Sequence, residues 1–201
     1  MSNLALRVIS AAVLGPIAIG ATYLGGWPFV LFWALAAGAV LWEWVKLVEG
    51  PIWKTAGIFY AGVLLVAPLV LRGDVELGFH AIILLFAIVW TTDIAGYFAG
   101  RAIGGPKLWP TISPKKTWSG ALAGLFGAMV MTVVGASFFG SFNSAALAGI
   151  ALLLSVCSQA GDLLESWIKR RFGAKDASHL IPGHGGVMDR LDGFWAAAFV
   201  G

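Results

Sequence analysis

Long apolar runs separated by short polar turns dominate the hydrophobic pattern of this chain. Six runs approach the length that an α-helix needs to cross a bilayer core, about 20 residues at roughly 1.5 Å per residue. They cover Leu6–Leu24, Pro28–Val48, Ala56–Leu71, Leu77–Gly100, Gly120–Gly140 and Ala145–Trp167, and a short apolar stretch follows from Val187. The pattern predicts an all-α, polytopic integral membrane protein with about six full transmembrane helices and a short C-terminal helix, in a single domain over residues 1–201.

The composition supports this class. The chain has 201 residues, of which 59% are hydrophobic and only 11% are charged, unlike a soluble globular protein. Its single cysteine, Cys157, cannot form an intrachain disulfide or a cysteine-based zinc site. The formal net charge is a modest +3 and no nucleic-acid-binding motif is present, so we expect no nucleic-acid partner.

The positions of Lys and Arg predict the orientation. If the N-terminus is cytoplasmic and the spans alternate, every Lys and Arg except Arg72 falls on or near the cytoplasmic side. This distribution follows the positive-inside rule, and the opposite orientation would invert it. The two long polar loops, at about 101–119 and 168–186, then share the cytoplasmic side.

Acidic residues within or beside the apolar runs are candidates for chemistry. Asp93 closes one run and Asp162 follows another. A charge in a membrane helix costs a few kcal/mol on insertion scales, which favours a polar cavity, although a helix-end cap or a snorkelling side chain is the alternative. Gln159, Asp162, Ser166 and Lys169 recur at helical spacing, which predicts one polar stripe leading toward the cytoplasmic loop.

A second acidic pair begins the last helix. Asp189 and Asp192 are three residues apart and share a face if this helix starts near Val187. Carboxylates in a chain with one Cys and three His suit Mg²⁺ better than zinc. The alternative is that Asp189 pairs with Arg190 or another local cation and only ends a loop.

Glycines and cations lie beside this pair. The sequence PGHGG, residues 182–186, is permissive backbone at a helix start, where N–H groups can bind phosphate oxygens, although alone it is usually a turn. Its neighbours Lys169, Arg170, Lys175 and Arg190 make it a candidate polyphosphate site. The other loop carries SPKKT, residues 113–117, which either contributes to binding an anionic substrate or is simply a solvated, positively charged loop.

These motifs carry a family resemblance. The stretch SWIKRRFGAKDASHLIPGHGGVMDRLD, Ser166–Asp192, resembles the signature of phosphatidate cytidylyltransferases, also called CDP-diacylglycerol synthases. DIAGYFAGR, Asp93–Arg101, is similar to the family's Asp-containing helix end, and SPKKTWSG, Ser113–Gly120, to its Ser-Pro-Lys-Lys-Thr motif. The resemblance covers a motif-bearing half at about 90–192, whereas the earlier spans match only generically. Ser119 departs from it, because an acidic or amide side chain is expected there.

The resemblance implies transfer of CMP from CTP to phosphatidate, giving CDP-diacylglycerol and pyrophosphate, by in-line attack of the lipid phosphate on the α-phosphorus. The expected partners are CTP, phosphatidate and the bilayer, and a homodimer is compatible with it. The expected cofactor is Mg²⁺, with Mn²⁺ as a substitute and room for a second cation. We expect an inner membrane protein of a bacterium, with the active site facing the cytoplasm.

The resemblance also assigns residue roles. The expected metal ligands are Asp162 and Asp189, supplemented by Asp192 and Asp93. The expected catalytic residues are Asp162, Asp189, Lys169, Arg190 and His184. The expected substrate-binding residues are Ser113, Lys115, Lys116, Thr117, Ser166, Arg170, Lys175, Asp176, Gly185 and Gly186.

Three points stay open from the sequence. A membrane transporter of lipids or ions could also place acids in helices and cations at a cytoplasmic mouth. A CTP-dependent lipid kinase would share the nucleotide and the bilayer but release CDP. The segment from Val187 would reach roughly 20 Å, so either it starts inside the protein, or the membrane thins, or the chain is truncated.

Overall fold

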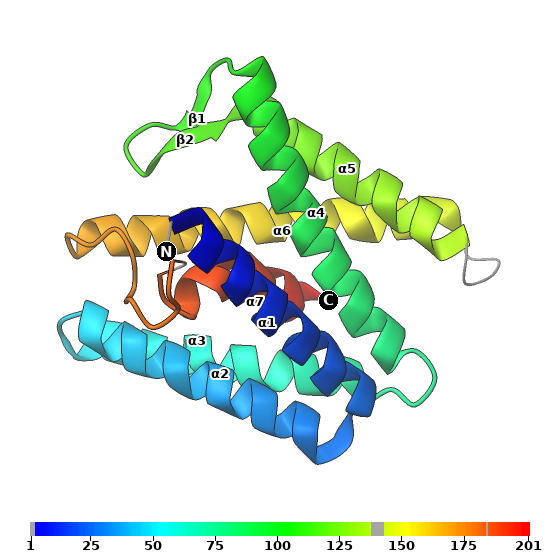
Figure 1. The fold of residues 1–201 in the computed structure, drawn as a ribbon, viewed down its shortest axis with the longest axis horizontal. Coiled ribbons are helices and arrows are strands. Elements are labelled where there is room, and N and C mark those ends of the chain that lie inside the picture. Colours follow the sequence, from blue (N-terminus) through cyan, green and yellow to red (C-terminus); the bar gives the residue numbers. More distant parts are fainter. Residues whose placement is uncertain (1–2, 138–142, 184) are drawn as a thin grey trace.

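The computed structural model describes residues 3–137, 143–183 and 185–201, which form helices and one small hairpin (Figure 1). In chain order the elements are α1 (Asn3–Leu24), α2 (Gly26–Leu47), α3 (Pro51–Arg72), α4 (Gly78–Ile103), β1 (Lys107–Trp109), β2 (Ser113–Thr117), α5 (Trp118–Ser137), α6 (Ser144–Arg171) and α7 (Met188–Val200). The predicted polytopic helical fold is therefore confirmed, with each expected span matched by one helix.

Five of the helices, α2 to α6, are long and apolar enough to cross a membrane. Within α1, which spans 22 residues, the segment Val8–Leu24 is apolar. Helix α7 has 13 residues and would reach about 20 Å, which is too short to cross the bilayer core.

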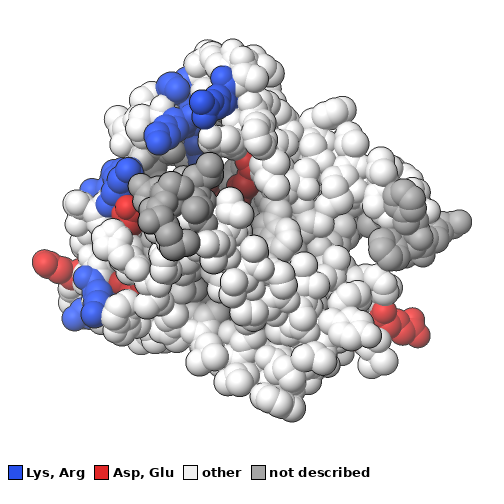
Figure 2. Space-filling view, in the orientation of Figure 1, with Lys and Arg blue, Asp and Glu red and all other residues white. Residues whose placement is uncertain are grey.

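The chain runs back and forth between two ends of the bundle (Figure 1). The α2–α3 turn, the hairpin and the residues 172–183 lie at one end, on the left of Figure 1, which we call the basic end. Figure 2 shows the Lys and Arg side chains of this face gathered at that end. Arg72 lies at the opposite end, where its Nε donates to the Thr22 carbonyl over 3.1 Å. The two long polar loops thus share one side, as the distribution of cations predicts.

The hairpin was not predicted, because the sequence indicated only a polar loop there. Strands β1 and β2 pair antiparallel, with Lys107 opposite Thr117 and Trp109 opposite Ser113. Where β2 ends, α5 begins, and the Thr117 hydroxyl accepts a hydrogen bond from the Gly120 N–H over 3.2 Å. Thr117 therefore caps the helix N-terminus, which otherwise has unpaired N–H groups.

Glycines bring α4 and α5 into close contact. A Cβ atom on Gly120 would lie 2.6 Å from the Gly96 carbonyl oxygen, and one on Gly124 would lie 2.8 Å from the Thr92 carbonyl oxygen. Small residues at these positions let the two backbones approach, as is common between membrane helices. This packing fixes the hairpin and the start of α5 beside the helix that carries Asp93.

Helix α7 lies in the middle of the bundle rather than at its edge (Figure 1). Phe194 stacks on Trp33 of α2 and on Phe86 of α4, with ring centroids 4.8 Å and 5.0 Å apart. Trp195 stacks on Tyr60 of α3 at 4.4 Å and donates its indole N–H to the Tyr60 carbonyl over 2.9 Å. The short helix therefore packs its buried side against α2, α3 and α4.

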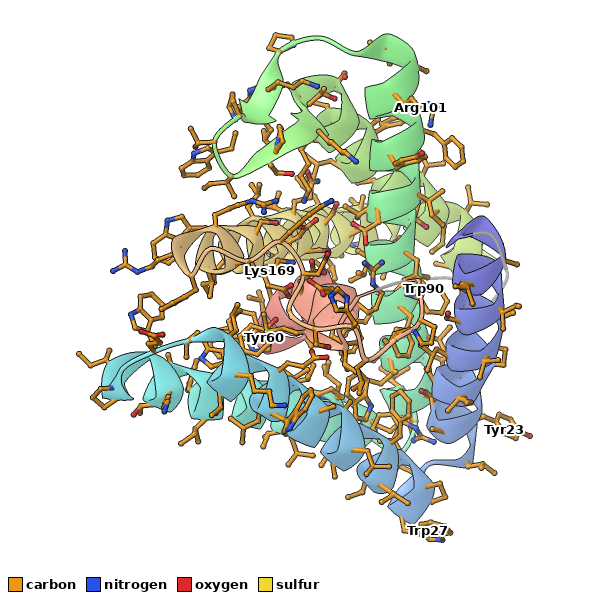
Figure 3. All side chains as sticks on the ribbon, turned by 60° about the vertical axis from the view of Figure 1, so that its left-hand side comes forward. Tyr23, Trp27, Tyr60, Trp90, Arg101 and Lys169 are labelled. Atoms are coloured by element: carbon orange, nitrogen blue, oxygen red, sulfur yellow. The ribbon has the colours of Figure 1, made fainter. Side chains whose placement is uncertain are left out.

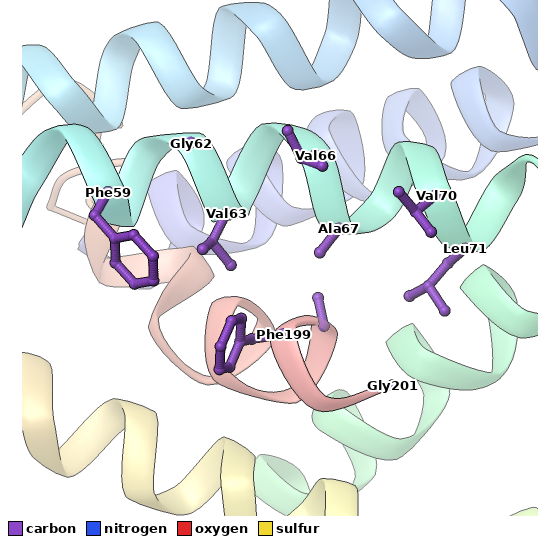
Figure 4. A pocket seen from close by; sticks show the side chains of 10 residues that line it. Phe59, Gly62, Val63, Val66, Ala67, Val70, Leu71, Phe199 and Gly201 are labelled. Carbon is purple, nitrogen blue, oxygen red and sulfur yellow. The ribbon is translucent and has the colours of Figure 1, made fainter.

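An apolar groove lies between α3 and the end of α7 (Figure 4). It measures about 440 Å³, and its lining includes Phe59, Val66 and Phe199 but no charged side chain. It can contact hydrocarbon, but it has no groups for binding a phosphate.

Candidate active site

A cavity of about 900 Å³ opens among α4, the hairpin, α5, α6 and α7 at the basic end. The three motif segments, Asp93–Arg101, Ser113–Gly120 and Ser166–Asp192, all contribute to its lining, although they are far apart in the sequence. The acidic residues in its lining are Asp93, Asp162, Asp176, Asp189 and Asp192. The basic residues in its lining are Arg101, Lys107, Lys115, Lys116, Lys169 and Arg190. The helix packing thus brings cations and carboxylates to one space, where a phosphate and a metal could lie together.

One ion pair joins the hairpin to α6. Lys116 of β2 donates to Asp162 Oδ2, and Ser166, one turn further along α6, donates to Asp162 Oδ1 over 3.4 Å. Both charged side chains keep about a quarter of their surface exposed, 29% for Lys116 and 23% for Asp162. The predicted polar stripe of α6 faces the cavity through Gln159, Asp162 and Lys169.

A second, more deeply buried cluster joins α6 to α7 (Figure 3). The Lys169 ammonium group donates to Glu165 Oε1 over 2.8 Å and to Asp189 Oδ1 over 2.5 Å. Figure 3 shows Lys169 at the centre of the molecule, whereas Tyr23 and Trp27 point outward far from it. Breaking a buried ion pair from one side typically costs about 3–5 kcal/mol, because the other charge remains buried.

Asp189 is held by further hydrogen bonds. Its Oδ2 accepts from the Ala177 N–H over 2.9 Å and from the Gly186 N–H over 2.7 Å. Burial raises the pKa of Asp189, but the hydrogen bond and charge of Lys169, together with the two N–H donors, outweigh burial and hold the pKa below its usual value. Asp189 is therefore a carboxylate, and its cationic partner is Lys169 rather than Arg190.

The other two acids expected to bind metal also reach the cavity. Asp192 Oδ1 accepts from the Gly193 N–H over 2.7 Å, and Asp93 of α4 lines the same cavity. Within the ranges that the structure describes, no three His, Cys, Asp or Glu side chains lie close enough to form a metal site by themselves. The donors are of the oxygen type that Mg²⁺ prefers, and the magnesium site stays a prediction.

Several expected substrate-binding residues lie outside the cavity lining. They are Ser113, Ser166, Arg170, Lys175, Gly185 and Gly186. The Arg170 guanidinium donates to the carbonyls of Ile112 and Ala174 over 3.4 Å and 3.1 Å, so it links the hairpin turn to the segment after α6. The Gly186 N–H is occupied by Asp189. His184 lies outside the described residues.

Sequence reasoning missed two buried acids. Glu165 pairs with Lys169, and Glu43 of α2 accepts hydrogen bonds from the segment before α7. Both side chains are fully buried. The signal was present for Glu43, because a carboxylate in the apolar run LWEWV is costly without polar partners.

Ser119, the departure from the family pattern, has partners of its own. Its hydroxyl donates to the Gly104 carbonyl and lies 3.0 Å from the Thr117 hydroxyl. The serine therefore ties the start of α5 to the end of α4.

Comparison with known proteins gives a consistent result. The model of the cytidylyltransferase family matches residues 50–201. The phosphatidate cytidylyltransferase of Brucella suis biovar 1 is 41% identical over 247 aligned residues, which cover 98% of this chain and 92% of the relative. The enzyme of the same name from Staphylococcus aureus strain COL is 45% identical over 119 residues, covering 58% of this chain and 45% of the relative. The chain therefore belongs to the cytidylyltransferase family.

Proposed function

We propose that this protein is a phosphatidate cytidylyltransferase, which transfers CMP from CTP to phosphatidate and releases pyrophosphate. The observation that carries the proposal is the cavity at the basic end, where lysines and arginines line the same space as five aspartates. The helices around it are apolar on their outer faces, so the cavity lies beside the place where a membrane lipid would be held. The relatives named above are consistent with this substrate pair.

The chemistry requires no protein nucleophile. An oxygen of the lipid phosphate forms a bond to the α-phosphorus of CTP while the bond to the pyrophosphate oxygen breaks. The protein then has to position the two phosphates in line and neutralise their charge. Lys116 and Lys115 on the hairpin and Arg190 on α7 line the cavity from different elements, so they can contact phosphates on opposite sides of it.

The aspartates support a metal ion as cofactor. Asp93, Asp162, Asp189 and Asp192 would repel a triphosphate if nothing stood between them. We propose Asp162 and Asp189 as the leading ligands of Mg²⁺, with Asp192 and Asp93 as further ligands of this or a second cation. Bound there, the ion would neutralise phosphate charge. Lys169 keeps Asp189 in place, and Asp162 is held by Lys116.

The location follows from the substrates. CTP is water-soluble and phosphatidate lies in the bilayer, so the cavity has to open toward the compartment that holds CTP. We propose that the protein lies in the inner membrane of a bacterium with the basic end facing the cytoplasm, as the positive-inside rule predicts. A homodimer stays a prediction.

The test is a reaction of the purified protein with phosphatidate vesicles and CTP labelled at the α-phosphate, with Mg²⁺ present. The expected products are a labelled CDP-lipid and unlabelled pyrophosphate. Labelled CDP together with a newly phosphorylated lipid would instead indicate a lipid kinase. Lipid movement across the vesicle without consumption of CTP would indicate a transporter. Either of these two results contradicts the proposal.

A further inference from the structure

Glu43 connects the second helix of the chain to the loop before α7. Its Oε1 accepts hydrogen bonds from the Ser178 hydroxyl over 2.6 Å and from the Val187 N–H over 2.9 Å. Its Oε2 accepts from the Met188 N–H over 2.7 Å. The Glu43 side chain is fully buried, although the residue lies far outside the motif-bearing half.

These contacts cap the N-terminus of α7. The first N–H groups of a helix have no partner within the helix, and here Val187, at the N-cap position, offers no side-chain acceptor. The Glu43 carboxylate supplies the cap from another helix, and its negative charge suits the positive end of the helix dipole. In return, the three donors offset the cost of burying the carboxylate.

The loop passes between Glu43 and Asp189. A Cβ atom on Gly186 would lie 2.7 Å from Glu43 Oε1, so the Gly186 backbone packs directly against the Glu43 carboxylate. On its other side, the Gly186 N–H donates to Asp189 Oδ2 over 2.7 Å. The position of Glu43 therefore sets the position of the Gly186 N–H group, which orients Asp189. Glu43 also binds the N–H of Met188, the residue directly before Asp189.

We propose that Glu43 is a positioning residue for the cytidylyl transfer, which acts by holding residues 177–178 and 185–188 so that Asp189 faces the cavity. This inference rests on the proposed function. Glu43 does not line the cavity. Its effect passes through Gly186 and the first turn of α7 to the carboxylate that Lys169 also holds.

The deciding variant is Glu43→Gln, which keeps the shape but turns an amide N–H₂ group toward a backbone N–H. We expect kcat/KM for CTP to fall about 10- to 100-fold in the folded variant, because a buried donor loses its acceptor beside Asp189. Hydrogen exchange at residues 186–188 should accelerate while exchange in α5 stays unchanged. Ser178→Ala removes one donor and leaves both backbone bonds, so we expect a loss of about two- to fivefold.

The matched control is Val40→Ala, one turn earlier on α2 and equally buried in the apolar core. It should lower the Tm through a cavity in the core but leave kcat and KM at wild-type values. If folded Glu43→Gln also keeps wild-type kcat, KM and exchange at 186–188, Glu43 is only structural and the proposal is wrong. If Glu43→Gln does not fold, a wild-type kcat/KM for CTP in Ser178→Ala overturns it.

Failure of the proposed function is seen separately. In that case the wild-type protein forms no CDP-lipid, whatever the exchange data show. If Glu43→Gln shows accelerated hydrogen exchange at residues 186–188 but turns over CTP at the wild-type rate, Glu43 contacts the loop without positioning Asp189 for the reaction. This result would overturn the positioning role.

Discussion

The N-terminal region, α1 to α3, and the motif-bearing region, α4 to α7, use polar side chains differently. In the motif-bearing region, acids and cations from α4, the hairpin, α6 and α7 meet around one cavity. In the described part of the N-terminal region, Lys46, Lys54 and Arg72 lie in the first or last turns of their helices, and Glu43 is the only charged side chain that is fully buried. The motif-bearing region carries the candidate chemistry, whereas the N-terminal region supports it structurally.

The support reaches the glycine-rich loop at two points. Glu43 accepts hydrogen bonds from the Val187 and Met188 N–H groups. The Ser10 hydroxyl of α1 donates a hydrogen bond to the Pro182 carbonyl oxygen over 2.8 Å. A loop of this kind has little apolar contact of its own and needs such bonds to keep one conformation. The comparison teaches that helices with no motif can still determine the geometry of a motif.

The largest effect is expected from neutralising the acids of the motif-bearing region. Asp162→Asn and Asp189→Asn should each lower CDP-lipid formation by about 1,000-fold or more, because the carboxylate charge that would hold the metal ion is removed. The measurement is turnover of labelled CTP by protein that elutes as a folded species. Asp74→Asn, in the α3–α4 turn at the opposite end, is the control and should keep wild-type turnover. Normal turnover by either cavity variant would exclude that residue from the metal site.

The next effect concerns stability. Lys169→Met leaves Glu165 and Asp189 buried without their shared cation, which should reduce the free energy of unfolding by about 3–5 kcal/mol. The change is measured as a lower midpoint of thermal unfolding in detergent. Lys54→Met, at an exposed position of the N-terminal region, should change stability by less than about 0.5 kcal/mol. Equal midpoints for the two variants would show that the buried cluster does not stabilise the bundle.

The helices and the clustering of cations at one end could be predicted from the sequence, because apolar run length and Lys/Arg placement are local properties. The chemical types that meet in the cavity were also visible in the motifs. The pairing of Asp189 with Lys169 rather than Arg190 was not, because it depends on how α6 packs against α7. The cap that Glu43 provides joins residues more than 140 positions apart, and no local pattern indicates which loop a buried acid will meet.

A moderate effect is expected where the hairpin meets α6. Lys116→Met removes the partner of Asp162 and one cation of the cavity, so kcat/KM should fall about 10- to 100-fold. Both charges are partly exposed, so stability should change by less than about 1 kcal/mol. Lys46→Met, whose ammonium group lies over the Trp42 ring in the N-terminal region, is the matched control and should keep wild-type kinetics. An unchanged kcat/KM in Lys116→Met would mean that the hairpin is not part of the site.

The smallest effect tests the weaker of the two supports from the N-terminal region. Ser10→Ala removes one hydrogen bond to the Pro182 carbonyl, and because that bond is exposed, water can replace the lost donor. We expect kcat/KM for CTP to fall by about two- to threefold, with faster hydrogen exchange confined to the loop around residue 182. Combined with Ser178→Ala, the loss should exceed the product of the single effects, since both bonds restrain one loop and neighbouring sites couple. Strictly multiplicative effects would mean that α1 and α2 hold separate parts of the loop and that the N-terminal region does not act on it as one support.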